Sequence, residues 1–182
     1  MNKTIWIVLG LAFFMLLTRG SHTLTPFSLP DASLAVFLLG GLWLKRWGWF
    51  AAFFVLGTVI DFGAAAFDPA QGFCLTNGYW GLIPSYAVMW LGGQWLGKQR
   101  DTFVPLQFTL VSMMTSFIAF VISTQTYYLF SGRFPNNGLT QTIQYGWNYL
   151  PNWMGFAAMY FALIWLGMYV LRQIKPVQAL QA

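Results

Sequence analysis

The 182-residue chain has few charges and only one cysteine, which excludes several classes of protein. Charged residues make up 7% of the sequence, whereas hydrophobic residues make up 58%. A soluble domain of this size could not bury so much apolar surface, so we predict an integral membrane protein in contact with the lipid bilayer. The single cysteine excludes a disulfide framework and a C-x-x-C redox pair.

Nucleic-acid binding is also excluded, although the net charge is +5. The basic residues are spread over several loops instead of clustering on one face. The sequence has no P-loop, no H-E-x-x-H, no long-period repeat and no appended soluble domain. We therefore expect one membrane domain over residues 1–182, without its own ATP-binding site.

Six apolar stretches predict an all-α bundle of six transmembrane helices. They are Thr4–Thr18, Ala32–Leu44, Trp47–Phe67, Tyr79–Gly97, Phe103–Phe130 and Pro151–Leu171. The first resembles a signal peptide, but no A-x-A-type cleavage site follows, so we interpret it as a retained helix. The second is shorter than the usual span of about 20 residues. We expect it to tilt little, to begin nearer Leu29, or to lie partly within the bundle.

The basic residues predict the orientation of this bundle. One side of a six-helix arrangement carries Lys3, Lys45, Arg46, Lys98, Arg100, Arg172 and Lys175. The other side carries Arg19 and Arg133. The positive-inside rule then places both termini in the cytoplasm and argues against a hairpin formed by the second and third stretches.

Polar uncharged side chains concentrate in the three outer loops, 19–31, 68–78 and 131–150. These loops hold Ser21, His22, Cys74, Asn77, Asn136, Asn137, Gln141 and Gln144. Asn148 and Asn152 also begin one face of the sixth stretch. An outer surface rich in amides and aromatic rings suits a large, mostly neutral ligand with amide groups better than an ion.

Three outer residues could carry chemistry. Asp61 lies at membrane depth in the third stretch, where a carboxylate is functional by default, or else pairs with Arg19 or Arg133. His22, the only histidine, is either a solvated loop residue or a ligand. Cys74 lies in the polar loop G-F-C-L-T-N-G, where packing demand is low, so its thiol is a candidate soft-metal ligand or nucleophile. Zinc is disfavoured because no clustered ligand spacing accompanies it.

Three short stretches resemble one family. T-R-G-S-H-T at 18–23, Asp61 in V-I-D-F-G, and G-F-C-L-T-N-G-Y-W at 72–80 are similar to the BtuM family of cobalamin-specific S-components of energy-coupling-factor transporters. Chain length, six short helices and cytoplasmic termini resemble S-components in general. The resemblance implies a multi-pass protein of the bacterial inner (cytoplasmic) membrane that takes up cobalamin.

The resemblance also implies residue roles. The position of the family's cobalt-coordinating cysteine is occupied by Cys74, and the accompanying histidine, aspartate and tyrosine positions by His22, Asp61 and Tyr79. It further implies that the Cys74 thiolate promotes reductive removal of the upper ligand of cyanocobalamin. Asn77, Asn148 and Asn152 are candidate hydrogen-bonding partners for the corrin amides.

One feature departs from the wider superfamily. The first stretch lacks the A-x-x-x-A pattern with which many S-components dock on an energising module. Whether this protein binds such a module is therefore an open question, and uptake without one is the alternative. Two other functions stay open as well. One is an S-component for another vitamin, and the other is a membrane thiol enzyme that uses Cys74, His22 and Asp61.

Overall fold

The structure is a computed structural model that describes residues 3–19, 29–99, 104–134 and 139–179. In these ranges the chain forms only helices and the turns between them, as the sequence predicts. The α-helices are α1 (Lys3–Arg19), α3 (Ser33–Trp43), α4 (Trp47–Phe67), α5 (Leu82–Leu96), α6 (Pro105–Phe130), α7 (Leu139–Trp147) and α8 (Leu150–Ala179). Two 3-10 helices, η1 (Pro69–Cys74) and η2 (Asn77–Gly81), lie between α4 and α5.

Three segments of the described chain are long and apolar enough to cross a membrane. They are Trp47–Phe67, Pro105–Phe130 and Ile143–Gln173. Their side chains face outward over most of their length, because 17 to 28% of each apolar window is buried inside the protein. This is the pattern of helices that contact lipid, so the chain is a membrane protein.

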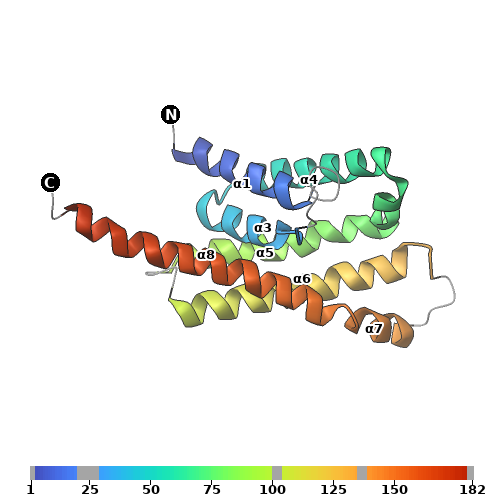
Figure 1. Cartoon of the computed structure of the whole chain (residues 1–182). Coiled ribbons are helices and arrows are strands. Elements are labelled where there is room, and N and C mark those ends of the chain that lie inside the picture. Colours follow the sequence, from blue (N-terminus) through green and yellow to red (C-terminus); the bar gives the residue numbers. More distant parts are fainter. Residues whose placement is uncertain (1–2, 20–28, 100–103, 135–138, 180–182) are drawn as a thin grey trace.

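The long helices run side by side in an elongated bundle (Figure 1). The start of α1 and the last turn of α8 lie toward the same end, on the left of the figure. The two 3-10 helices and α7 lie toward the opposite end. For ease of reference, we call the end that carries η1, η2 and α7 the loop end.

Helix α3 forms the centre of the bundle and is shorter than the usual membrane span of about 20 residues. It has 11 residues, and every residue from Ser33 to Leu42 is buried. It packs mainly on α5, where glycines let the two backbones touch. A Cβ atom on Gly41 would overlap the carbonyl oxygen of Trp90, and one on Gly93 would overlap that of Leu38. Of the arrangements expected for the second apolar stretch, the structure shows burial within the bundle.

Two regions differ from the helices that the sequence predicts. The fourth stretch does not begin as an α-helix at Tyr79, because Tyr79 lies in η2 and α5 begins at Leu82. The loop 131–150 contains α7, which hydrophobic length alone does not reveal. In α7, Leu139 and Ile143, one turn apart, line a cavity against α6 together with Trp147.

The contact between α3 and α5 generates a stability prediction. We expect Gly93→Ala to lower the free energy of unfolding by about 1–3 kcal/mol, because the added methyl group must push two backbones apart. The thermal midpoint of the detergent-solubilised protein measures this effect. Gly155→Ala in α8 is the matched control, since a Cβ atom there meets nothing within 4 Å. Equal midpoints for the two variants would contradict the close contact.

Candidate functional site

A buried ion pair between α1 and α4 is the centre of the polar structure near the loop end. The Arg19 guanidinium donates two hydrogen bonds to Asp61, from Nε to Oδ1 at 2.7 Å and from Nη2 to Oδ2 at 2.6 Å. The Arg19 side chain is 8% exposed and that of Asp61 is 20% exposed. Because a lone charge at this depth is costly, each group makes the burial of the other possible.

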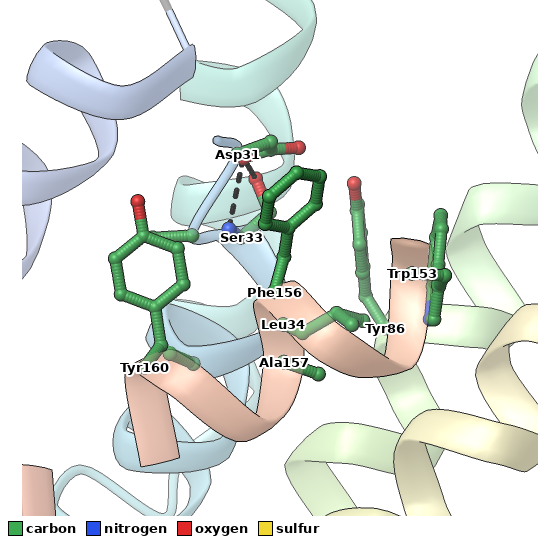
Figure 2. Close-up of a pocket in the computed structure, with 10 residues that line it drawn as sticks. Asp31, Ser33, Leu34, Tyr86, Trp153, Phe156, Ala157 and Tyr160 are labelled. Carbon is green, nitrogen blue, oxygen red and sulfur yellow. Dashed lines mark hydrogen bonds between the residues drawn. The ribbon is translucent and has the colours of Figure 1, made fainter. Parts of the chain in front are cut away.

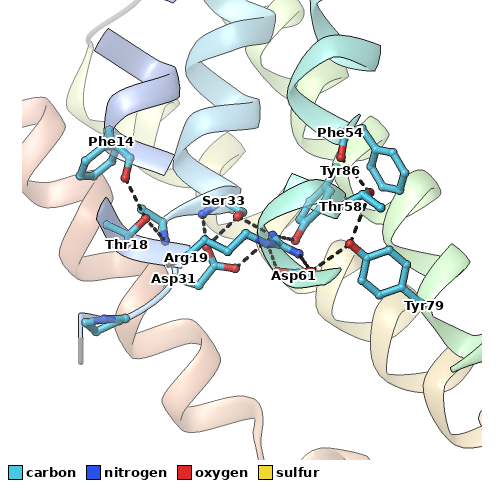
Figure 3. A network of polar contacts seen from close by, with 12 residues as sticks. Phe14, Thr18, Arg19, Asp31, Ser33, Phe54, Thr58, Asp61, Tyr79 and Tyr86 are labelled. Atoms are coloured by element: carbon cyan, nitrogen blue, oxygen red, sulfur yellow. Dashed lines mark hydrogen bonds and ion pairs between the residues drawn. The ribbon is translucent and has the colours of Figure 1, made fainter. Parts of the chain in front are cut away.

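The third guanidinium nitrogen of Arg19, Nη1, connects two further helices. It donates to Ser33 Oγ on α3 at 2.7 Å and to the Tyr86 hydroxyl on α5 at 2.8 Å. Asp31 Oδ2 lies 3.4 Å from the same atom. Figure 3 shows the guanidinium between these partners. One arginine therefore ties together α1, α3, α4 and α5.

The local sequence explains why these groups meet. Asp31 precedes α3, and its Oδ1 accepts hydrogen bonds from the Ser33 backbone N–H at 2.9 Å and hydroxyl at 2.6 Å, which fixes the first turn. Thr18 donates to the Phe14 carbonyl, within α1. Its oxygen in turn accepts from the Ala32 N–H at 3.3 Å, so the start of α3 is held beside the end of α1.

Tyr79 attaches η2 to this ion pair. Its hydroxyl donates to Asp61 Oδ2 at 2.9 Å, and the Tyr79 side chain is buried. Thr58, one turn before Asp61, lies 3.4 Å from the same hydroxyl (Figure 3). Asp61 is thus the acceptor shared by α1 and η2, and we call Arg19, Asp61, Tyr79, Ser33 and Tyr86 the Arg19 network.

Cys74 ends η1 at the surface, close to the Arg19 network. Asp68 caps η1 by accepting a hydrogen bond from the Ala70 N–H, and Pro69 follows at the first helical position. Gly72 lies against α4, since a Cβ atom there would come within 3.2 Å of the Ala65 side chain. The Cys74 thiol is exposed. The loop is therefore held by its own capping and packing, while Cys74 is exposed.

The surroundings of Cys74 set its protonation. Partial removal of water and then the carboxylate of Asp61 raise the pKa of the Cys74 thiol above its ordinary value, although Arg133 and Arg19 oppose this change. Arg133 lies over the ring of the neighbouring Phe73, 4.1 Å from its centroid. Near neutral pH the group is therefore a thiol, and a metal that binds it must displace the proton.

The structure brings together three of the residues that the sequence singled out. Asp61 and Tyr79 are hydrogen-bonded, and Cys74 lies in electrostatic range of Asp61. His22 lies outside the described residues. Asn77 is exposed in η2, and Asn148 and Asn152 are exposed between α7 and the first turn of α8, without a described contact to Cys74. As the alternative to a functional role, the sequence offered Arg19 or Arg133 as the partner of Asp61, and the structure shows the pair with Arg19.

Ser33, Tyr86 and Asp31 were not singled out from the sequence. Asp31 and Ser33 lie at the start of the second apolar stretch and Tyr86 lies inside the fourth, and only the packing of four helices shows that they surround one guanidinium. The signal available in advance was Arg19, one of two basic residues on the predicted outer side. A cation next to a membrane helix requires partners, and these would be sought among nearby hydroxyls and carboxylates.

The network also bears on the thiol-enzyme interpretation. Asp61 Oδ1 and Oδ2 are both occupied by Arg19, and Oδ2 also accepts from Tyr79. This leaves the carboxylate poorly placed to orient a histidine base for Cys74. Among the residues that the structure describes, no group of three or more His, Cys, Asp or Glu side chains could hold a metal ion.

The ion pair predicts a large stability effect for one neutral substitution. Asp61→Asn should lower the free energy of unfolding by roughly 2–4 kcal/mol, because it leaves the Arg19 charge buried without its counter-charge. Thermal unfolding in detergent measures the loss. Asp68→Asn is the control, since Asp68 is exposed and an asparagine oxygen can still cap η1. Similar midpoints for the two variants would mean that the pair contributes little.

The electrostatics of Cys74 predict its reactivity with pH. The rate of alkylation by iodoacetamide should rise with a midpoint above the ordinary thiol value of about 8.5, because partial removal of water and the Asp61 carboxylate disfavour the thiolate. Arg133→Gln should move the midpoint further upward, since it removes a cation that stabilises the thiolate. Lys98→Gln, at the turn after α5, should leave the midpoint unchanged. A midpoint below 8.5 in the unmodified protein would contradict the prediction.

In comparisons with known proteins, no family model matches the chain, and no curated protein matches it. The function therefore has to be argued from the chain's own residues and their geometry.

Proposed function

We propose that the protein is a cobalamin-binding membrane transport protein in which Cys74 coordinates the cobalt ion of the transported ligand. The observation that carries this proposal is an exposed, solitary thiol, held at the loop end beside a buried charge network. A thiolate is a strong, soft donor to a transition metal. The positive charge of a bound cobalt(III) corrin would favour loss of the thiol proton, despite the raised pKa of Cys74.

The environment of the thiol supports a flat ligand with apolar faces. The Phe73 ring lies 6.2 Å from that of Tyr127, and Phe134 lies 4.7 Å from Tyr128, so aromatic rings collect around the end of α6. Within the described chain, the Tyr127 hydroxyl is buried without a hydrogen-bond partner. A ligand with peripheral amides would provide one. The exposed side chains of Asn77, Asn148 and Asn152 are further candidates for hydrogen bonds to the amides of the ligand.

The Arg19 network would act as the rigid base of this site. Tyr79 ties η2 to Asp61, and η2 also packs directly on α6, since a Cβ atom on Gly78 would lie 2.7 Å from Tyr127 Cα. These contacts fix both sides of the loop that carries Cys74. In this proposal Asp61 and Tyr79 act by fixing the position of the loop. Of the three residues that the resemblance places beside Cys74, His22 is therefore the candidate for direct contact with the ligand.

The proposal includes a topology. It has six membrane crossings, with α1, α3 and α5 as the shorter ones, and both termini in the cytoplasm of a bacterial cell whose inner membrane holds the protein. The start of α1 and the end of α8 lie at the same end of the bundle, opposite the Cys74 loop (Figure 1). This arrangement supports an even number of crossings. The ligand then enters from the outer side.

We propose that uptake proceeds without an energising module docked on α1. The exposed side chains of this helix include the large residues Ile5, Trp6, Leu9 and Phe13. Close docking of another helix requires small residues at the contact, and this face offers bulky ones. Uptake would then be facilitated diffusion of cobalamin.

Removal of the upper ligand from cyanocobalamin would be a second step at the same thiol. Cyanide leaves cobalt with its electron pair and takes up a proton, and cobalt(III) gains one electron to become cobalt(II). The chain has one cysteine, so it cannot supply electrons by closing an internal disulfide. A soluble thiol of the glutathione class is the reductant: two such thiols form one disulfide and reduce two cobalt ions. Coordination by Cys74 would weaken the opposite cobalt–cyanide bond.

The test is the visible spectrum of protein purified from cells supplied with cyanocobalamin. The wild type should carry a corrinoid band shifted from that of the free vitamin, and it should release cyanide when glutathione is added. Cys74→Ser, which preserves size and polarity, should lose both the shift and the cyanide release. Absence of a corrinoid from the wild type would overturn the proposed function. The role of Cys74 would be overturned by a wild-type band at the position of the free vitamin, or by the same shifted band in Cys74→Ser.

A further inference from the structure

A cavity of about 110 Å³ lies between the start of α3 and the first turns of α8. Its walls are largely aromatic, with Trp153, Phe156 and Tyr160 from α8 and Tyr86 from α5. Polar side-chain atoms come from the Asp31 carboxylate and from the hydroxyls of Ser33, Tyr86 and Tyr160 (Figure 2). Phe156 is 47% exposed and the Asp31 side chain is 48% exposed, so the cavity is accessible from outside the protein. Cys74 is not among its lining residues.

The Asp31 carboxylate provides a negative charge at this cavity that is only weakly paired. Its Oδ1 accepts from Ser33, and among the described residues its Oδ2 contacts Arg19 Nη1 alone, at 3.4 Å. Arg19 makes its two shortest carboxylate contacts with Asp61 instead. In the part of the chain that the structure describes, one guanidinium therefore faces two carboxylates, so this cluster has a net negative charge beside the cavity.

The aromatic side chains are held in fixed positions around this charge. The Tyr160 hydroxyl donates to the Pro30 carbonyl at 2.5 Å, which fixes the ring at the entrance to α3. Trp153 packs edge-on against Phe120, with ring centroids 5.7 Å apart. In Figure 2, Phe156 and Tyr160 stand on one side of the cavity and Tyr86 and Trp153 on the other. Aromatic faces with a nearby carboxylate attract organic cations.

Other ligand classes suit the cavity less well. A metal ion would need several oxygen ligands, and the lining offers one carboxylate and the hydroxyls of Ser33, Tyr86 and Tyr160. These hydroxyls already bond to Asp31, Arg19 and the Pro30 carbonyl, respectively. An anion would be repelled by Asp31. A cavity of about 150 Å³ can hold a benzene ring, so this one has room for an ammonium head with about five non-hydrogen atoms.

We infer that this cavity binds a small organic cation of the alkylammonium class, with Asp31 opposing its charge and Trp153, Phe156 and Tyr160 contacting its alkyl groups. The site goes beyond the proposed function, because it uses neither Cys74 nor a metal. It shares only the Arg19 network with the thiol loop, since Asp31, Ser33 and Tyr86 contact Arg19.

The test compares two probes of nearly identical shape. Choline carries a quaternary ammonium group, and 3,3-dimethylbutan-1-ol replaces its nitrogen with carbon and has no charge. Titration calorimetry on the purified protein in detergent should show choline binding at least tenfold more tightly, because cation–π and charge attraction act on choline alone. Equal binding of the two probes, or no choline binding, would overturn the inference.

Matched variants assign the binding to this cavity. Asp31→Asn should weaken choline binding about tenfold while an amide oxygen still accepts from Ser33, and Phe156→Leu should weaken it severalfold. Asp68→Asn, which alters another capping carboxylate on the other loop, should bind choline like the wild type. Cys74→Ala should also bind like the wild type, which separates this site from the proposed cobalt ligand. Wild-type affinity in Asp31→Asn would overturn the inference.

Discussion

The bidentate pair between Arg19 and Asp61 is the interaction on which the loop end of this protein depends. A guanidinium in a membrane bundle cannot give up its proton, so it must find acceptors for its donors within the protein. Asp61 accepts hydrogen bonds from Nε and Nη2 of Arg19, and Ser33 and Tyr86 accept hydrogen bonds from Nη1. Because these acceptors come from three other helices, satisfying one side chain fixes the relative positions of four.

The same pair extends its effect to the loop between α4 and α5. Tyr79 donates to Asp61, and η2 packs on α6 so closely that a Cβ atom on Gly81 would overlap the Thr126 side chain. On the other side, the capped helix η1 lies against α4. Cys74 lies between these two supports. A thiol that is exposed and yet carried by a fixed backbone is better arranged to bind a ligand than to pack in a core.

The centre of the bundle has a different physical basis. Helix α3 has no charges and is buried on all sides, and its glycines allow direct backbone contact with α5. In a membrane the hydrophobic effect does not drive helices together, so this close packing is an important source of attraction between them. The buried α3 also brings Asp31 and Ser33 to Arg19. The packing of the core and the polar network thus depend on the same short helix.

The sequence by itself determined the membrane class, the helical fold, the limits of α4 and the unusual position of Cys74. These follow from composition and local pattern, since apolar length and loop chemistry are properties of neighbouring residues. It also proposed Arg19 as one of two partners for Asp61, and the structure selected Arg19. Only the tertiary structure brought Ser33, Tyr86 and Asp31 to that pair. It also placed α3 inside the bundle, formed α7 against α6, and enclosed the aromatic cavity. Such contacts join residues up to 130 positions apart, as between Tyr160 and Pro30, and depend on how helices pack, which no local pattern encodes.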